Sequence, residues 1–322
     1  MNNSTILGVS KDQMRCPLSG AAKAISMIKG AAMIIIGTEE CTYYTTSTLG
    51  MRGAKNNCFS LVLDNDDITF GAASKLEAFV EKVITEHRPR SLFLVTTCVA
   101  EVIGEHYHTI AEAAQGKHGI PVKVIPTCHF EGKNSEHGFE LVSQAAAPFA
   151  RLPNKKIMSL MKLFFGHSKK GRDRRPKTNL STPENLPKPS YRMGLLWTLL
   201  EMKDAIVLEY GTAGTTAYAM KTLMMRGIDT TDKLFTTGLS QQEIVMGDTT
   251  RLENAILKLD DAYSPRRIFV LSSSISEVTG MDVKGVCNYM QEQVNAQIIA
   301  ITGHGFGGDF EDGVRAANSY NE

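Results

Sequence analysis

The sequence has no long hydrophobic run and no excess of one charge. Its longest purely apolar stretch is Ala31 to Ile36, whereas a membrane-spanning helix needs roughly 20 apolar residues, so we expect no membrane partner. Met1 to Gln13 has no apolar core of the signal-peptide type, which predicts a cytoplasmic protein. The 35 Lys and Arg residues nearly balance 34 Asp and Glu residues, and the net charge of +1 argues against a nucleic-acid partner.

Two short ligand-binding motifs are also absent. No cysteine pair is spaced as C-x-x-C, the arrangement that structural zinc sites usually use, so zinc is the less favoured metal. The glycine-rich segment Gly303 to Gly308 is not followed by Lys and Ser or Thr, which excludes a P-loop. The composition, 43% hydrophobic and 21% charged over 322 residues, is typical of a globular chain with two domains.

A basic, proline-rich segment divides the chain. Arg151 to Ser190 contains 11 Lys or Arg residues and five of the 11 prolines, but only Asp173 and Glu184 as acids. Such a stretch is typical of an exposed linker. We therefore predict one domain over residues 10–150, a basic linker over residues 151–188 and a second domain over residues 189–322.

The two predicted domains are similar to each other in sequence. Ile36-Gly37-Thr38 is matched by Tyr210-Gly211-Thr212, at an offset of 174 residues (211 − 37). After a two-residue insertion, Ile68 to Gly71 is matched by Ile244 to Gly247, at an offset of 176 (247 − 71). A single change of offset over roughly a hundred positions indicates an internal duplication.

Each repeat has the pattern of an α/β unit. Short apolar runs without alternation predict parallel strands that are buried on both faces. These strands are Ala32 to Ile36, Cys58 to Leu63, Leu92 to Val95 and Val122 to Ile125, then Ala205 to Glu209, Lys233 to Thr237, Arg267 to Leu271 and Gln297 to Ile301. Helical spacing predicts helices over Gly71 to Glu86 and Gly247 to Tyr263. The expected fold class is α/β, with two tandem doubly wound (Rossmann-like) parallel-sheet domains.

Three cysteines of the first repeat lie at points where ligands of such sheets bind. Cys41 follows the first strand, Cys98 follows the third, and Cys16 precedes a short helix rich in Gly and Ala. Ligand sites of parallel sheets lie at the carboxyl ends of strands, so we expect Cys41 and Cys98 at one edge. Soft thiolates favour iron–sulfur ligation. The alternative is three unrelated buried thiols, the role we expect for Cys58 and Cys287.

The second repeat lacks these three thiols. All three equivalent positions carry hydroxyl groups instead: they are Ser190, Thr215 and Ser274. Because the three positions change together, they behave as members of one site. We therefore predict that the first repeat carries the site, whereas the second repeat has kept only the fold.

Four segments of the first repeat carry a family resemblance. They are Cys16-Pro17-Leu18-Ser19-Gly20-Ala21, Ile36-Gly37-Thr38-Glu39-Glu40-Cys41, Asp67-Ile68-Thr69-Phe70-Gly71 with Lys75-Leu76, and Thr96-Thr97-Cys98-Val99-Ala100-Glu101-Val102-Ile103-Gly104. Together they resemble the nitrogenase component 1 family, which includes the molybdenum-iron protein subunits, the cofactor-assembly scaffolds and the catalytic subunits of dark-operative protochlorophyllide reductase. The last segment resembles β-type subunits most. The resemblance implies the first domain of such a subunit, present twice.

The resemblance also implies a cofactor and partners. In the family, cysteines at the positions of Cys16, Cys41 and Cys98 bind an iron–sulfur cluster at a subunit interface, either a P-cluster or a [4Fe–4S] cluster. An ATP-dependent iron protein is the implied electron donor, and a homo-oligomer or pairing with another component 1 subunit is the implied assembly. The ligands of the molybdenum cofactor have no matched position, so dinitrogen reduction is not expected, and no catalytic residue is assigned.

Three hypotheses of function follow. The first is a cluster-bearing electron-transfer component of a nitrogenase-like oxidoreductase. The alternatives are a scaffold that assembles or transfers a cluster or cofactor precursor, and a cluster-free structural relative. A fourth iron ligand is also open: Cys128, His129, a hydroxyl of the second repeat or an exogenous group are candidates. The two repeats could pair within one chain, or two chains could pair their first repeats.

Overall fold

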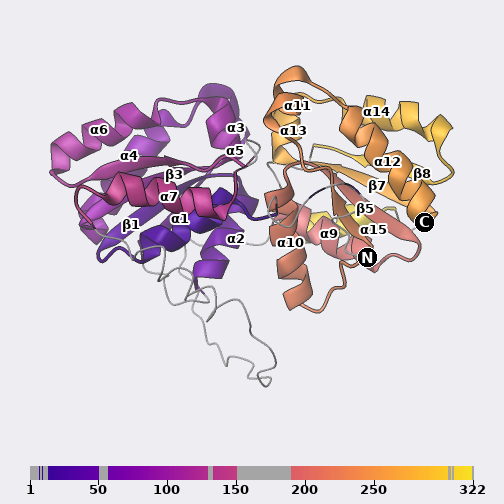
Figure 1. Cartoon of the computed structure of the whole chain (residues 1–322), viewed down its shortest axis with the longest axis horizontal. Coiled ribbons are helices and arrows are strands. Elements are labelled where there is room, and N and C mark those ends of the chain that lie inside the picture. The colour runs from indigo at the N-terminus through magenta and orange to yellow at the C-terminus, as the bar shows by residue number, and fades with distance from the viewer. Residues whose placement is uncertain are drawn as a thin grey trace.

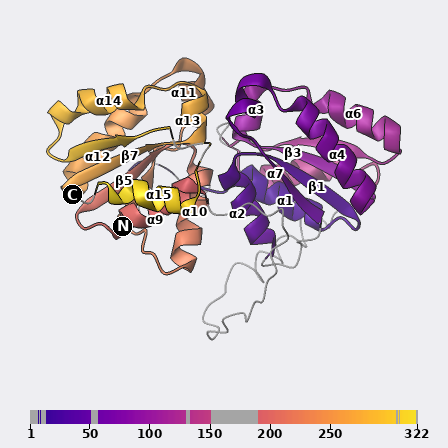
Figure 2. The same ribbon diagram turned by 180° about the vertical axis from the view of Figure 1, so that it is seen from behind.

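The chain forms two α/β domains side by side in a computed structural model (Figure 1). The structure describes residues 7, 9, 14–50, 57–129, 133–150, 190–303, 306 and 308–320, without the side chains of residues 47–50. The predicted linker over residues 151–188 lies outside the described residues. Figure 2 shows from the opposite side that each domain has its own sheet with helices around it. None of the described helices has the length and hydropathy needed to cross a membrane.

Four parallel strands form the sheet of the first domain, in the order β2-β1-β3-β4. They are β1 (Ala31–Gly37), β2 (Cys58–Val62), β3 (Ser91–Thr96) and β4 (Val122–Pro126). The central strands β1 and β3 are buried along their whole length, which explains why their sequences are apolar without alternation. In the register of the sheet, Ile34 pairs with Phe59 on one side and Leu94 on the other.

The second domain repeats this arrangement in the order β6-β5-β7-β8. Its strands are β5 (Ala205–Tyr210), β6 (Leu234–Thr236), β7 (Arg267–Ser272) and β8 (Gln297–Ile301). Leu208 pairs with Phe235 and Val270, which are the positions that the sequence repeat assigns to the paired triplet of the first domain. The predicted fold class of two tandem parallel-sheet α/β domains is therefore confirmed.

Helices cover both faces of each sheet. In the first domain, α1 (Pro17–Ser26) and α7 (Ser135–Ala146) pack on one face, and α4 (Ala73–His87) and α6 (Tyr107–His118) on the other. In the second domain, the corresponding helices are α9 (Tyr191–Glu201), α15 (Phe310–Asn318), α12 (Thr250–Tyr263) and α14 (Val283–Met290). Shorter elements complete the set: α2 (Glu39–Gly50), α3 (Asn65–Phe70), α5 (Cys98–Ile103), α10 (Ala213–Met225), α11 (Gln241–Met246), α13 (Ser274–Val278) and the 3-10 helix η2 (Gln291–Gln293).

The sequence patterns missed two of the short helices, α3 and α11. Each begins with a capping box, in which the side chains of Asp64 and Ser240 accept hydrogen bonds from the backbone amides of Asp67 and Glu243. An Asp or Ser followed three residues later by an acid was the available signal. The longer helices predicted to follow them are confirmed as α4 and α12, with later starts.

Glycines let the paired helices of each domain approach backbone to backbone. A Cβ on Gly20 of α1 would overlap the carbonyl oxygen of Ser135 at the start of α7. In the second domain, a Cβ on Gly194 of α9 would overlap the carbonyl oxygen of Phe310 in α15. The close contact of these helices therefore depends on the missing side chains.

We expect Gly20→Ala and Gly194→Ala each to lower the free energy of unfolding by about 1–3 kcal/mol, because the added methyl group must push two helices apart. Urea unfolding followed by circular dichroism measures this change. Gly116→Ala in α6 is the matched control, since a Cβ there has no heavy atom within 4 Å. The control should be neutral or stabilising by up to about 1 kcal/mol. Equal stability of the three variants would contradict the packing argument.

Candidate functional site

The two domains meet through helices that the sequence repeat relates to each other. α2 lies against α10, and α5 lies against α13. Tyr44 of α2 stacks on its repeat equivalent, Tyr218 of α10, with ring centroids 5.8 Å apart and planes at 6°. The repeats therefore pair about a local pseudo-twofold axis within one chain, one of the two arrangements that the sequence left open. Assembly with a second copy or with another component 1 subunit stays a prediction.

Cys16 lies at this interface as a buried free thiol directly before α1. A Cβ placed on Gly214, in the first turn of α10, would lie 3.0 Å from the Cβ of Cys16 and 2.8 Å from Nδ1 of His129. The backbone amide of Gly214 donates a hydrogen bond of 3.0 Å to that same nitrogen of His129. Two residues of the first domain thus pack against the start of a second-domain helix.

Cys41 lies in the first turn of α2, near Cys16. Burial raises the pKa of Cys41 to about 11, while hydrogen bonds with Thr38 and, across the interface, with Thr215 lower it. Burial raises the pKa of Cys16 to about 12, with smaller contributions from the charges of Cys41 and Cys128. These three thiols are therefore close enough for their charges to interact. Without a metal, Cys16 and Cys41 are protonated near neutral pH.

Cys98 begins α5, directly after β3. Its Sγ accepts a hydrogen bond of 3.1 Å from the backbone amide of His129. Because the ring of His129 contacts α10, this residue links Cys98 to the place where Cys16 lies. The structure thus brings Cys16 and Cys41 together and connects Cys98 to them through His129. Cys58 and Cys287 are buried core residues of β2 and α14, as predicted.

The donor set has the chemistry of an iron–sulfur site rather than of a single-ion site. Among the described residues, no three or more His, Cys, Asp or Glu side chains form a group that could hold one metal ion. A sulfide-bridged cluster does not need such convergence, because its irons take separate thiolates. Metal binding also displaces thiol protons, which Cys16 and Cys41 carry here. The three cysteines fit a cluster, and their role as its ligands stays a prediction.

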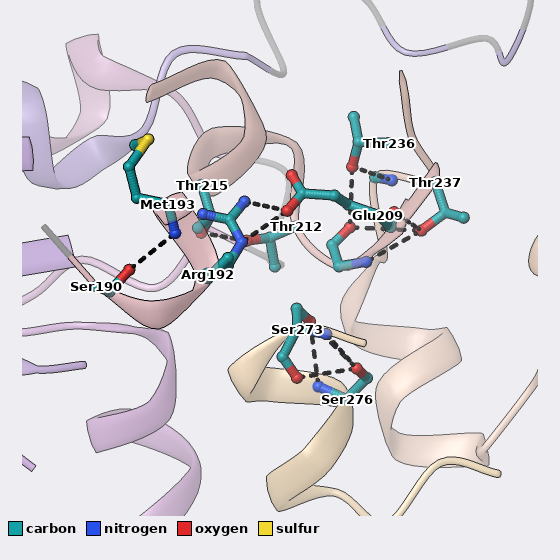
Figure 3. Close-up of polar contacts among 12 residues, drawn as sticks. Ser190, Arg192, Met193, Glu209, Thr212, Thr215, Thr236, Thr237, Ser273 and Ser276 are labelled. Carbon is teal, nitrogen blue, oxygen red and sulfur yellow. Dashed lines mark hydrogen bonds and ion pairs between the residues drawn. The ribbon is translucent and has the colours of Figure 1, made fainter. Parts of the chain in front are cut away.

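A buried ion pair lies on the second-domain side of the interface (Figure 3). Arg192, in the first turn of α9, donates from Nε to Oε1 of Glu209 in β5 over 2.6 Å, and its Nη2 forms an ion pair with the same oxygen. The two side chains are only 3% and 2% exposed. The strand pattern did not predict this pair, although a Glu inside an otherwise apolar strand was a signal for it.

Glu40 reaches this pair from the first domain and is also buried. Burial raises the pKa of Glu40, whereas the positive charge of Arg192 and a hydrogen bond with Ser190 lower it. Ser190 is the second repeat's equivalent of Cys16. The two halves of the interface therefore differ in chemistry, because one carries thiols and the other carries charges and hydroxyls.

We expect the metal-free chain to lose stability as pH rises above about 9, because Cys16 ionises there when unfolded but stays protonated up to about pH 12 when folded. The stabilisation by the protonated thiol is complete below pH 9 and is lost between these two values. Between about pH 9 and 10, the free energy of unfolding should fall about 1.4 kcal/mol per pH unit more steeply than in Cys16→Ser. Urea unfolding tests this, and equal slopes for the two proteins would contradict it.

The comparison with known protein families gives one match that covers most of the chain. The family model for nitrogenase component 1 type oxidoreductases matches twice, over residues 16–186 and 190–320. The two matches lie on the two domains described above. This agrees with the duplication inferred from the sequence repeat.

Individual relatives match shorter stretches. The nitrogenase iron-molybdenum cofactor biosynthesis protein NifE of Clostridium pasteurianum is 30% identical over 130 residues, which cover 39% of this chain and 28% of NifE. The nitrogenase molybdenum-iron protein alpha chain of Methanosarcina barkeri is 27% identical over 141 residues, 40% of this chain and 26% of the relative. The structure of nitrogenase Cp1 at pH 5 is 16% identical, with a TM-score of 0.36 over 86% of this chain and 45% of that one.

This chain thus spans little more than a quarter of the length of the two curated relatives it matches. The family assignment rests on the match of the family model, which takes in both domains. The chain belongs to the family of nitrogenase component 1 type oxidoreductases.

Proposed function

We propose that this chain is a scaffold that holds an iron–sulfur cluster or a metallocofactor precursor at Cys16, Cys41 and Cys98 and passes it to another protein. The name of the NifE relative, a cofactor biosynthesis protein, supports a scaffold over an electron carrier. The observation that carries the proposal is the one-sided interface, in which thiols of the first domain face hydroxyls of the second. A cluster bound from one side has fewer bonds to break on release.

The surroundings of the thiols suggest the fourth ligand. Cys128 is buried, and its charge acts on Cys16, so it is the candidate fourth thiolate. His129 is the weaker candidate, because its Nδ1 already accepts a hydrogen bond from Gly214. A bound cluster supplies sulfide-bridged iron, which can be transferred or reduced as one unit. The backbone amide of His129 donates to the sulfur of Cys98, a contact that stabilises a thiolate there.

One observation favours a second candidate function, the acceptance of electrons from an ATP-dependent iron protein. Large apolar side chains are exposed on two equivalent short helices: Phe70 of α3 is 84% exposed, and Val245 and Met246 of α11 are 74% and 73% exposed. Figures 1 and 2 both show α3 and α11 at the inner edges of their domains. Exposed apolar groups of this size indicate a protein-binding surface. A protein docked there would touch both domains.

Anaerobic reconstitution with iron and sulfide tests the site. We expect about four irons per chain with matching acid-labile sulfide, as in a [4Fe–4S] cluster. The variants Cys16→Ser, Cys41→Ser and Cys98→Ser should lose most of this iron, because Ser hydroxyls are poor iron ligands. Cys58→Ser and Cys287→Ser, at buried thiols of β2 and α14, are matched controls and should keep it. Near-zero iron in the wild-type chain would leave only the cluster-free hypothesis.

Transfer separates the two cluster-bearing functions. The loaded chain is mixed with an apo acceptor protein, and iron and sulfide are measured in the acceptor after separation. A scaffold delivers both. An electron-transfer component instead keeps its cluster and is reduced by a cognate iron protein only when ATP is present. Retention of the cluster together with ATP-dependent reduction would contradict the scaffold proposal.

The apolar surface on α3 and α11 gives a separate prediction. Phe70→Ser should weaken binding of an ATP-dependent iron protein at least about tenfold, because it removes a large apolar anchor. Tyr289→Ser on α14 is the matched control, since Tyr289 is 65% exposed but lies on the outer part of the second domain. Biolayer interferometry with the full chain measures both. Equal affinities of the two variants would show that the partner does not use this surface.

A further inference from the structure

The ion pair of Arg192 and Glu209 is not required by the fold. The repeat assigns Leu18 and Ile35 to the same two positions of the first domain, where both are buried in the core between helix and strand. Two apolar side chains therefore satisfy the same helix–strand contact. A buried ion pair rarely stabilises a fold more than apolar residues of similar size do. The charges in the second domain therefore need another explanation.

The pair lies beside the cysteine site. Figure 3 shows the guanidinium group of Arg192 between Glu209 and Thr215. Thr215 forms a hydrogen bond with Cys41 across the domain interface, so a single side chain separates the buried cation from a thiol. Within the described part of the chain, Nη1 of Arg192 and Oε2 of Glu209 have no hydrogen-bond partner. The guanidinium is thus held by one carboxylate oxygen and is not fully neutralised.

The charge of Arg192 acts on the first domain. It acts on the thiol of Cys41 and on the buried carboxyl of Glu40, although both belong to the other repeat. Glu209 has no comparable effect on Cys41 among the groups that influence that thiol. The field at Cys41 is therefore dominated by the positive end of the pair.

We propose that Arg192 holds a positive charge beside Cys41 and thereby raises the reduction potential of the metal group bound there. The proposal rests on the cluster site proposed above. A cluster gains negative charge when it is reduced, and a nearby buried cation stabilises that charge. Glu209 fixes the guanidinium and offsets part of its charge. The duplication thus supplies thiols from one repeat and a tuning charge from the other.

The chain itself offers the matched variant. Arg192→Leu with Glu209→Ile copies the residues of the first domain into the second, so the helix–strand contact keeps an arrangement that this fold already tolerates. Glu209→Gln alone removes only the negative charge and leaves Arg192 less neutralised. Each full-length chain is reconstituted anaerobically, its iron and sulfide are measured, and its reduction potential is determined by titration followed in the visible and electron paramagnetic resonance spectra. Thermal unfolding of the metal-free proteins checks that they fold.

We expect equal iron contents and potentials that move in opposite directions. At a fixed solution potential, the ratio of reduced to oxidised cluster should fall about three- to tenfold in the double variant and rise in Glu209→Gln. A purely structural role would not produce opposite shifts. Unchanged potentials in iron-loaded variants would overturn the role of Arg192 and leave the cluster site standing, as would loss of iron from folded variants alone. Absence of iron from the wild-type chain would overturn both.

Discussion

The contact between the start of α10 and the first domain is the constraint on which the candidate site depends. Gly214 lies so close to Cys16 and His129 that any side chain at this position would collide with them. Its amide also fixes the imidazole of His129, whose own backbone amide contacts the sulfur of Cys98. The repeat assigns Glu40 to the same position in α2, and its buried side chain extends toward Arg192. One position, Gly in one repeat and Glu in the other, makes the two half-sites different.

Duplication explains how such a site arises in one chain. Family members described above place related subunits about a shared interface, and here two repeats meet about a pseudo-twofold axis marked by the stacked pair of Tyr44 and Tyr218. The sheets and helix pairs are nearly the same in both repeats because the core requires them. Positions at the interface are free of that requirement. They diverged into thiols on one side and hydroxyls and a charged pair on the other.

Much of the fold could be predicted from the sequence, because local patterns decide it. The apolar runs Leu92 to Val95 and Val122 to Ile125 fall within β3 and β4, and the repeat offsets give the register of both sheets. The helices α3 and α11 were missed because six residues make too few turns for a periodic pattern. The interface could not be predicted: the hydrogen bond between Gly214 and His129 joins residues 85 positions apart, and no local pattern reports such a contact.

Iron K-edge X-ray absorption of the anaerobically loaded chain tests the central claim most directly, because it reports which atoms surround the metal. The account predicts iron surrounded by sulfur, with iron–iron scattering typical of a sulfide-bridged cluster. In Cys41→Ser, the sulfur and iron–iron contributions should both decrease. Iron coordinated only by oxygen and nitrogen, or a wild-type spectrum unchanged by Cys41→Ser, would contradict the assignment of this interface as a cluster site.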